Sequence, residues 1–178
     1  MKNEVDGRRE IASRNTAWAN IIARKLTHWG VTPNQISMMS VFFATVGCLL
    51  LIGTVIYPGF NKYVAYILFV VCMQSRLLCN LFDGMVAIEG GKKSANGDLY
   101  NDMPDRFADA LFIIPVGYVA GGFGIELGWL AALLAVMTAY FRWIGAYKTH
   151  QHFFNGPMAK QHRMALLTLT FVVATCTI

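Results

Sequence analysis

The chain has 178 residues, of which 56% are hydrophobic and 14% are charged, and its mean hydropathy is +0.46. This composition excludes an ordinary soluble domain, which carries more charge, and indicates an integral membrane protein. The net charge of +5 would suit a nucleic-acid partner, but the basic residues form short clusters between apolar segments and no nucleic-acid-binding motif accompanies them. We therefore expect no nucleic acid.

The cysteines and the N-terminus narrow the class of protein further. The four cysteines lie in apolar segments without a CxxC pair or a neighbouring histidine, at positions 48, 72, 79 and 176. This pattern supports neither a disulfide framework nor a zinc site. The chain is polar up to about Gly30, so we expect no cleaved signal peptide and expect the first membrane span to direct insertion.

Residues 1–32 are predicted to form a cytoplasmic N-terminus with an amphipathic interfacial helix. Four large apolar residues recur at steps of seven, four and seven, which places them on one stripe of a helix: Ile11, Trp18, Ile22 and Trp29. Basic residues lie elsewhere on its surface, as in a helix that lies along a membrane. A soluble amphipathic helix packed on a partner is the alternative. Gly30 and Pro33 end the helix in either case.

Residues 33–178 are predicted to form one membrane domain. The first span, Ile36 to Tyr57, is uncharged and exceeds the roughly 20 residues that a crossing needs. The second span is expected from Tyr63 to Phe82. A third helix carries the acids and is then uncharged from Ala110 to Ile125, and a fourth span runs from Leu127 to about Tyr147. Met164 to Ile178 begins a fifth that is short for a crossing, so we expect the last span to be missing or cut short.

The predicted fold is therefore an all-α, polytopic membrane helix bundle of five to six transmembrane helices, preceded by an amphipathic juxtamembrane helix. Basic residues gather before the first span, after the second and after the fourth, whereas Lys62 alone falls on the other side. Because positive loops stay in the cytoplasm, the acids at the ends of the second and third spans face the cytoplasm. A bacterial-type inner membrane is the expected location.

The segment from Asn80 to Asp109 contains six of the ten acidic residues of the chain. Carboxylates beside apolar spans are costly unless they are paired, hydrated or bound to a cation. Two sets of polar residues follow helical spacing, so each lies on one helix face: Arg76, Asn80 and Asp83, and then Asp98, Asp102, Asp105 and Asp109. Two such faces opposite each other would form an oxygen cage for Mg²⁺ or Mn²⁺, which usually implies phosphate chemistry.

Several residues of this segment have two interpretations. Arg76 either neutralises Asp83 in a structural ion pair or contacts a phosphate. Pro104 either kinks the third helix or lies near its start, with Asp102 as the cap. The small residues Gly84, Ala87 and Gly97 leave room for a ligand against bare backbone, or serve close helix packing.

These residues resemble the CDP-alcohol phosphotransferases, whose signature reads D, two residues, DG, two residues, AR, eight residues, G, three residues, D, three residues, D. The chain supplies Asp83-Gly84, Ala87, Gly97 and Asp105 at matching intervals. It departs from the signature at three places, with Asn80 at the first acid, Ile88 at the arginine and Asn101 at the third acid. Thr32 to Ser37 looks like the start of the family's first span, and Lys160 and Arg163 lie where the family has basic residues before its fifth.

The resemblance implies a membrane transferase of phospholipid biosynthesis, usually dimeric, that moves a substituted phosphate from a CDP-alcohol to an acceptor alcohol with release of CMP. CDP-diacylglycerol is the expected donor. By position, Asp105 is the expected general base and Gly84, Ala87 and Gly97 line the CDP moiety. The expected oxygen ligands of Mg²⁺ or Mn²⁺ are Asn80, Asp83, Asn101, Asp102 and Asp105, of which the asparagines lack the negative charge that strengthens cation binding.

Basic residues near the same face are the expected contacts of substrate phosphates: Arg76, Arg142, Lys160 and Arg163. Lys92 and Lys93 either replace the missing arginine at a phosphate or, as is more common for a charged pair in a cytoplasmic loop, act only as a topology signal. Asp102 is expected to replace the third acid as a ligand.

Other functions fit parts of the same segment. Asn101 to Asp109 matches the NDxxDxxxD motif of intramembrane prenyltransferases, but Glu126 is the only acid downstream of Asp109, and that family needs a second acidic motif. The two asparagines also suit a catalytically weak or inactive relative that binds nucleotide or lipid, and the acids suit a cation-conducting bundle.

Overall fold

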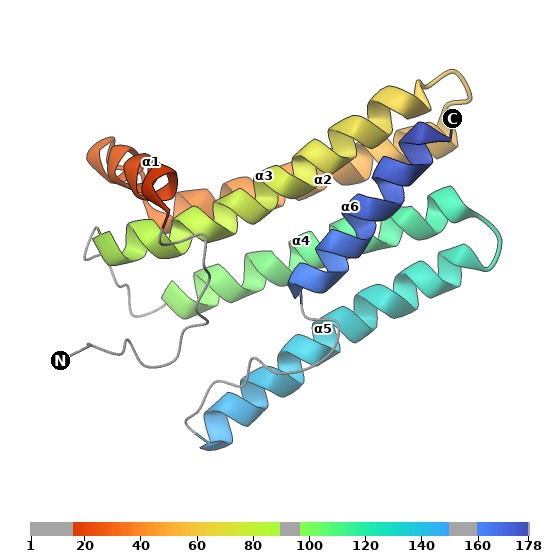
Figure 1. Cartoon of the computed structure of the whole chain (residues 1–178). Coiled ribbons are helices and arrows are strands. Elements are labelled where there is room, and N and C mark those ends of the chain that lie inside the picture. The colour runs from red at the N-terminus through yellow and green to blue at the C-terminus, as the bar shows by residue number, and fades with distance from the viewer. Residues whose placement is uncertain (1–15, 90–96, 150–159, 178) are drawn as a thin grey trace.

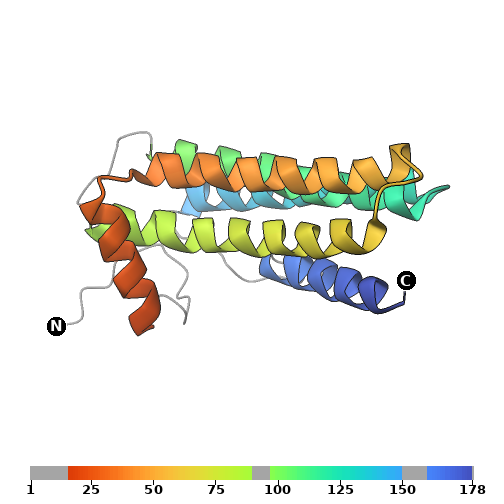
Figure 2. The same cartoon turned by 90° about the horizontal axis from the view of Figure 1, so that it is seen from above.

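The computed structural model describes residues 16–89, 97–149 and 160–177, and for 97–101 it describes the backbone only. Within these ranges the chain forms six helices and no strand, which confirms the all-α prediction: α1 (Ala17–His28), α2 (Pro33–Ile56), α3 (Lys62–Glu89), α4 (Gly97–Ala120), α5 (Gly124–Thr149) and α6 (Lys160–Cys176). The helices α2 to α6 run lengthwise in the bundle, and α1 crosses one end of α3 (Figures 1 and 2).

The start of α2 is set by local sequence. The Thr32 side chain accepts a hydrogen bond from the backbone of Gln35, and the Gln35 side chain accepts one from the backbone of Thr32. This capping box satisfies backbone donors that a helix start leaves unpaired, and Pro33 in the first turn loses no intrahelical bond. Gly30, with φ of 74°, makes the turn that separates α1 from α2.

The boundary between α4 and α5 differs from the prediction. We expected the third span to run to Ile125, but α4 ends at Ala120 and α5 begins at Gly124. Gly121 and Gly122 have φ of 69° and 49°, which is a left-handed conformation that ends a helix. Two adjacent glycines therefore stop α4, although the segment is uniformly apolar and hydropathy alone gives no sign of a turn.

The start of α4 excludes one of the two interpretations of Pro104. The helix begins at Gly97 and continues through Pro104, so Asp102 lies inside the helix and is not its N-cap. A proline inside a helix costs about 3 kcal/mol. Because α4 packs along both α2 and α5, tertiary packing offsets this local cost.

An aromatic cluster joins α3, α4 and α6 in the middle of the bundle. The rings of Phe69 and Phe112 are 5.5 Å apart between centroids, and those of Phe69 and Phe171 are 4.6 Å apart. Tyr66 stands edge-on to Phe171 at 4.9 Å. All four residues are buried. The cluster therefore packs α6 against α3, which in turn contacts α4 through Phe69 and Phe112.

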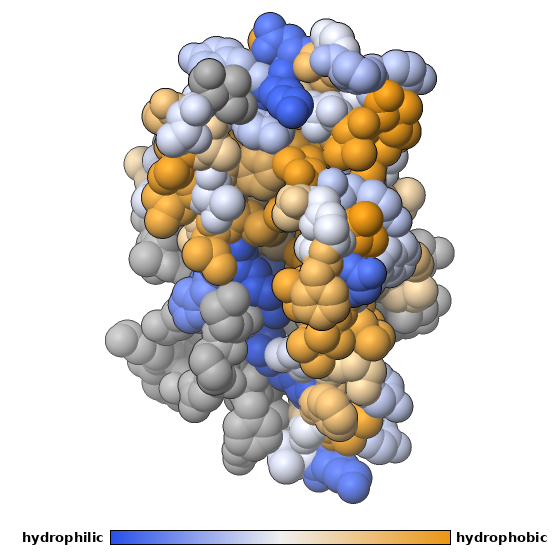
Figure 3. All heavy atoms as spheres, turned by 90° about the vertical axis from the view of Figure 1, so that its right-hand side faces the viewer, coloured by the Kyte–Doolittle hydropathy of each residue, from blue (hydrophilic) through white to orange (hydrophobic). Residues whose placement is uncertain are grey.

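The outer faces of the bundle are apolar, as expected in a membrane. Large hydrophobic side chains of α2, α3, α5 and α6 are exposed, and Figure 3 shows apolar residues over much of one face. Among the described helices, α2, α3 and α5 are each long and apolar enough to cross a membrane by length and composition. The helix α4 carries the acids and α6 has 17 residues, so these two complete the bundle without meeting that criterion.

The predicted amphipathic helix is present as α1, but small residues attach it to the bundle. Ala19 and Ala23 are fully buried in a cluster with Leu81, Phe82 and Val86 of α3. Trp18 stands edge-on to Phe82, with centroids 6.1 Å apart. Three residues of the predicted apolar stripe are exposed by 38% or more, namely Trp18, Ile22 and Trp29, whereas Ile11 lies outside the described residues. These side chains are therefore available to the membrane surface.

Candidate functional site

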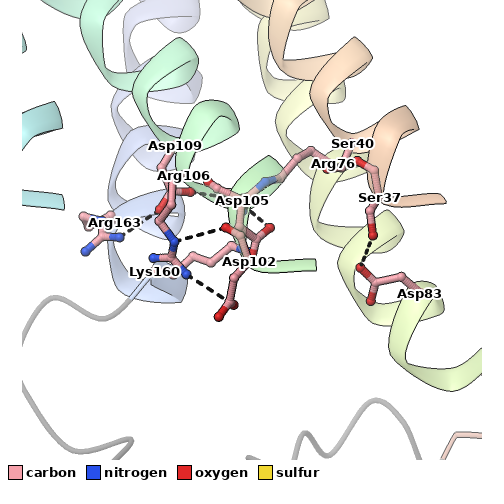
Figure 4. A network of polar contacts seen from close by, with 10 residues as sticks. All are labelled: Ser37, Ser40, Arg76, Asp83, Asp102, Asp105, Arg106, Asp109, Lys160 and Arg163. Carbon is pink, nitrogen blue, oxygen red and sulfur yellow. Dashed lines mark hydrogen bonds and ion pairs between the residues drawn. The ribbon is translucent and has the colours of Figure 1, made fainter. Parts of the chain in front are cut away.

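The site lies where the second half of α3, the first half of α4 and the first turn of α6 meet. Arg76 comes from α3, Asp105 and Asp109 come from α4, and Lys160 and Arg163 come from α6 (Figure 4). These five side chains form a continuous network of ion pairs.

Arg76 is the centre of the network. Its side chain is completely buried, and its Nη2 donates to Asp109 Oδ1 at 2.6 Å and to Asp105 Oδ1 at 3.3 Å. The ion pair that the sequence allowed between Arg76 and Asp83 is not formed, because Arg76 reaches across to α4. One guanidinium thus links two buried carboxylates that are one helical turn apart.

The basic residues of α6 occupy the remaining oxygens of the same carboxylates. Lys160 Nζ donates to Asp105 Oδ2, and Arg163 Nη2 donates to Asp109 Oδ2 at 2.9 Å. Each oxygen of both carboxylates therefore has a cationic partner. The side chain of Lys160 is 22% exposed, whereas that of Arg76 is 0% exposed. The outer part of the network is reachable from solvent and its centre is not.

Asp83 stands outside this network. It is buried, and Ser37 Oγ of α2 donates to its Oδ2 at 3.1 Å. Ser40, one turn further along α2, donates to the backbone oxygen of Ser37 at 2.7 Å. Among the described residues, no basic side chain forms an ion pair with Asp83. A buried carboxylate without a cationic partner is costly, and such a group is suited to hold a metal ion.

Other polar atoms of the site also lack a partner within the described part of the chain. These buried atoms are Nε and Nη1 of Arg76 and Nδ2 of Asn80. Asn80 lies one turn after Arg76 and one turn before Asp83 on α3, so the three side chains share a helix face. The unpaired groups are therefore adjacent on one helix, where a polar ligand or water would satisfy them.

The remaining predicted site residues are spread around this centre. The side chain of Asp102 is 58% exposed, and its Oδ1 lies 3.8 Å from Nη2 of Arg106. It therefore points away from the buried pair Asp105 and Asp109. Gly84 is buried and Ala87 is half-buried on α3, directly after Asp83, and Arg142 is half-buried on α5. Gly97 begins α4. The side chains of Asp98 and Asn101, together with Lys92 and Lys93, lie outside the described residues.

Among the described residues, Asp83 is the buried carboxylate that could contribute a ligand to a divalent cation. Mg²⁺ is usually held by one or two carboxylates together with waters and substrate phosphates. Asp83 meets this description, with the amide oxygen of Asn80 one turn away. Asp105 and Asp109 are already neutralised, and the described residues contain no group of three His, Cys, Asp or Glu side chains that could hold a metal ion. The wide carboxylate cage expected from spacing is therefore not assembled by these side chains.

Sequence reasoning missed Ser37 as a partner of Asp83, and it placed Asp109 on the acidic helix face without assigning it as a specific ligand or base. Asp109 continues the helical spacing of Asp102 and Asp105 by one turn, which was a usable signal for a second buried acid. Ser37 had no such signal, because its contact depends on how α2 packs against α3.

A comparison with protein families identifies the family of the chain. The model of the CDP-alcohol phosphatidyltransferase family matches residues 30–178, which include every helix from α2 to α6. The chain belongs to this family. A search of curated proteins finds no match to the chain. The CDP-alcohol phosphatidyltransferases are membrane transferases with a CDP-alcohol donor and an alcohol acceptor, so the resemblance seen in the spacing from Asp83 to Asp105 is confirmed at the level of the family.

Proposed function

We propose that the protein transfers a phosphatidyl group from CDP-diacylglycerol to an acceptor alcohol and releases CMP, as a step of phospholipid biosynthesis. The observation that carries this proposal is the match of the family over residues 30–178, combined with the donor-site spacing from Asp83 to Asp105. The exposed apolar faces of the bundle support a donor that is itself a membrane lipid.

In the proposed reaction, the acceptor hydroxyl attacks the phosphorus distal to cytidine. A new phosphorus–oxygen bond forms, the bond to the CMP oxygen breaks, and the hydroxyl proton passes to Asp105. Gly84, Ala87 and Gly97 would leave space for the cytidine side, and Arg76, Lys160 and Arg163, with Arg142, would provide positive charge for phosphates. A protein carboxylate that takes up the proton makes the attacking oxygen a stronger nucleophile.

We include Mg²⁺ or Mn²⁺ in the proposal, held first by Asp83 and Asn80, with Asn101, Asp102 and Asp105 as the further expected ligands. Such an ion would neutralise charge on the donor diphosphate. The buried carboxylate of Asp83, which accepts from Ser37 but has no ion-pair partner among the described residues, supports this assignment. The cytoplasmic orientation follows from the basic residues, and we propose an inner-membrane homodimer because the family resemblance favours one.

One observation favours the alternative of a relative that binds the donor without turnover. Both oxygens of Asp105, the proposed base, are engaged by cations. The prenyltransferase interpretation has no comparable support, because the family match covers the upstream motif residues that it leaves unexplained.

The test is release of CMP by purified protein given CDP-diacylglycerol, Mg²⁺ or Mn²⁺, and a panel of alcohols that includes glycerol phosphate, inositol phosphate, serine and lipid hydroxyls. We expect CMP with at least one acceptor and none from the Asp105→Asn variant. Tight binding of CDP-diacylglycerol without CMP would establish the binding-only alternative. Release of inorganic diphosphate from a prenyl donor would overturn the proposed donor class.

A further inference from the structure

Asp105 has a cationic partner at each of its carboxylate oxygens in the ion-pair network. Its Oδ1 accepts from Arg76 Nη2 at 3.3 Å, and its Oδ2 accepts from Lys160 Nζ. A carboxylate that takes a proton from an acceptor hydroxyl needs an oxygen within hydrogen-bond reach of that hydroxyl. A carboxylate oxygen can accept a second hydrogen bond, but a bound cation competes with the acceptor hydroxyl for the oxygen and its negative charge. Withdrawal of one cation would therefore favour activation of the acceptor.

The two cations differ in how easily they can leave. Arg76 is fully buried, and the same Nη2 that binds Asp105 also binds Asp109 at 2.6 Å. Its withdrawal would leave two buried carboxylates without their shared partner, which is strongly unfavourable. Lys160 is the first residue of α6, its side chain is partly exposed, and Asp105 is its ion-pair partner within the described chain. Its withdrawal leaves Asp105 still paired with Arg76.

The chemistry of Lys160 suits such an exchange. An ammonium group on a flexible four-carbon stem donates up to three hydrogen bonds and can turn from one anion to another. A phosphate oxygen is the competing anion that the proposed reaction brings to this end of α3 and α4. The neighbouring carboxylate of Asp109 stays paired when Lys160 moves, because Arg163 and Arg76 both remain bound to it.

We infer that Lys160 is a positioning residue that moves from Asp105 Oδ2 to a phosphate oxygen of the bound donor and so exposes Oδ2 to the acceptor hydroxyl. The inference rests on the proposed function and deepens it, since it makes the base available only when the donor is bound.

The effect of Asp105→Asn on donor affinity distinguishes the proposed movement of Lys160 from other roles of Asp105. In the Asp105→Asn variant, Lys160 no longer has an anionic partner and is free for phosphate. We therefore expect CDP-diacylglycerol to bind about tenfold more tightly than to the original protein, while CMP release is lost. If Asp105 acted only as a base, donor affinity would stay the same, and if it were mainly a metal ligand, affinity would fall.

The experiment measures equilibrium binding of CDP-diacylglycerol in detergent micelles, once with Mg²⁺ and once with EDTA. Lys160→Met should weaken binding about tenfold in both conditions, and Lys160→Arg should restore it. Lys25→Met is the matched control, because it removes the same charge from an exposed position on α1 and should leave donor affinity unchanged. If Asp105→Asn does not fold, the Lys160 variants test the exchange by themselves.

Each outcome separates this inference from the proposed function. If the original protein binds the donor and releases CMP but Asp105→Asn binds no more tightly, the exchange is overturned and the transferase assignment stands. Unchanged donor affinity in Lys160→Met has the same meaning. Failure of the original protein to bind CDP-diacylglycerol under any condition overturns the proposed function and the exchange together.

Discussion

The completely buried guanidinium of Arg76 places a positive charge in the interior of a membrane bundle. Burial of a charge is costly, and two close carboxylates offset that cost here. The consequence for stability is asymmetric, because loss of one partner exposes the full desolvation cost of those that remain.

The Arg76→Met variant should therefore lose about 3–5 kcal/mol of unfolding free energy, since Asp105 and Asp109 stay buried with fewer cationic partners. Unfolding by sodium dodecyl sulfate from mild detergent micelles would measure the loss. Arg24→Met is the control, because the Arg24 side chain is 80% exposed and lies 3.9 Å from Glu89. Equal effects of the two substitutions would contradict the importance of the buried network.

Ser37 is a second single residue with a testable role, because its hydroxyl donates a hydrogen bond to Asp83. If Asp83 holds the divalent cation, Ser37→Ala should weaken Mn²⁺ binding by about 10-fold or more, because a hydrogen bond to a ligand sets its orientation. Electron paramagnetic resonance of bound Mn²⁺ would measure the affinity. Ser40→Ala is a matched control, since Ser40 is buried on the same helix and, within the described ranges, its hydroxyl donates to the Ser37 backbone oxygen and does not contact Asp83. A shared drop in both variants would point to general disruption of α2.

At the scale of the helices, the joint between α4 and α5 depends on glycines that bring two backbones together. A Cβ atom on Gly117 would overlap the carbonyl oxygen of Gly124 and lie 3.0 Å from the Cα of Gly128. Because both neighbours are backbone atoms, neither can turn aside. Small residues at such a crossing are typical of helix packing in membranes.

Gly117→Ala should therefore destabilise the protein by about 1–3 kcal/mol through overpacking of this crossing. Thermal unfolding in detergent would record it as a lower midpoint. Gly59→Ala provides the comparison, because a Cβ atom there meets nothing within 4 Å. A Gly117→Ala variant as stable as Gly59→Ala would show that α4 and α5 separate easily.

At the scale of the whole molecule, the two ends of the bundle have different chemistry. The end of the bundle that contains α1 carries the basic residues Arg24 and Lys25, and the α2–α3 turn lies at the opposite end with Lys62 (Figures 1 and 2). We expect the first end to face the cytoplasm.

Labelling of intact cells tests this orientation. After replacement of the four native cysteines, an impermeant thiol reagent should reach Gly59→Cys in the α2–α3 turn and should not reach Lys25→Cys on α1. Both positions should react once the membrane is opened. The reverse pattern in intact cells would place the site outside the cytoplasm and would contradict the proposed location.

Much of this architecture follows from the sequence alone. Hydropathy and helical spacing predict the helices of the bundle, because a membrane requires long apolar segments with satisfied backbone. The resemblance of the segment from Asp83 to Asp105 to the family signature predicts the family, and the family match over residues 30–178 confirms it. The start of α2 is also set by local sequence, through the capping box of Thr32 and Gln35.

Tertiary structure alone decided which helix each polar face meets. Helical spacing puts Arg76 and Asp83 on one stripe, but α3 is packed so that Arg76 pairs with Asp105 and Asp109 while Asp83 pairs with Ser37. Spacing likewise groups Asp102 with Asp105, yet Asp102 is exposed and Asp105 is held between Arg76 and Lys160. The physical reason is that a sequence period specifies direction around one helix axis, whereas charge pairing depends on the distance to the next helix.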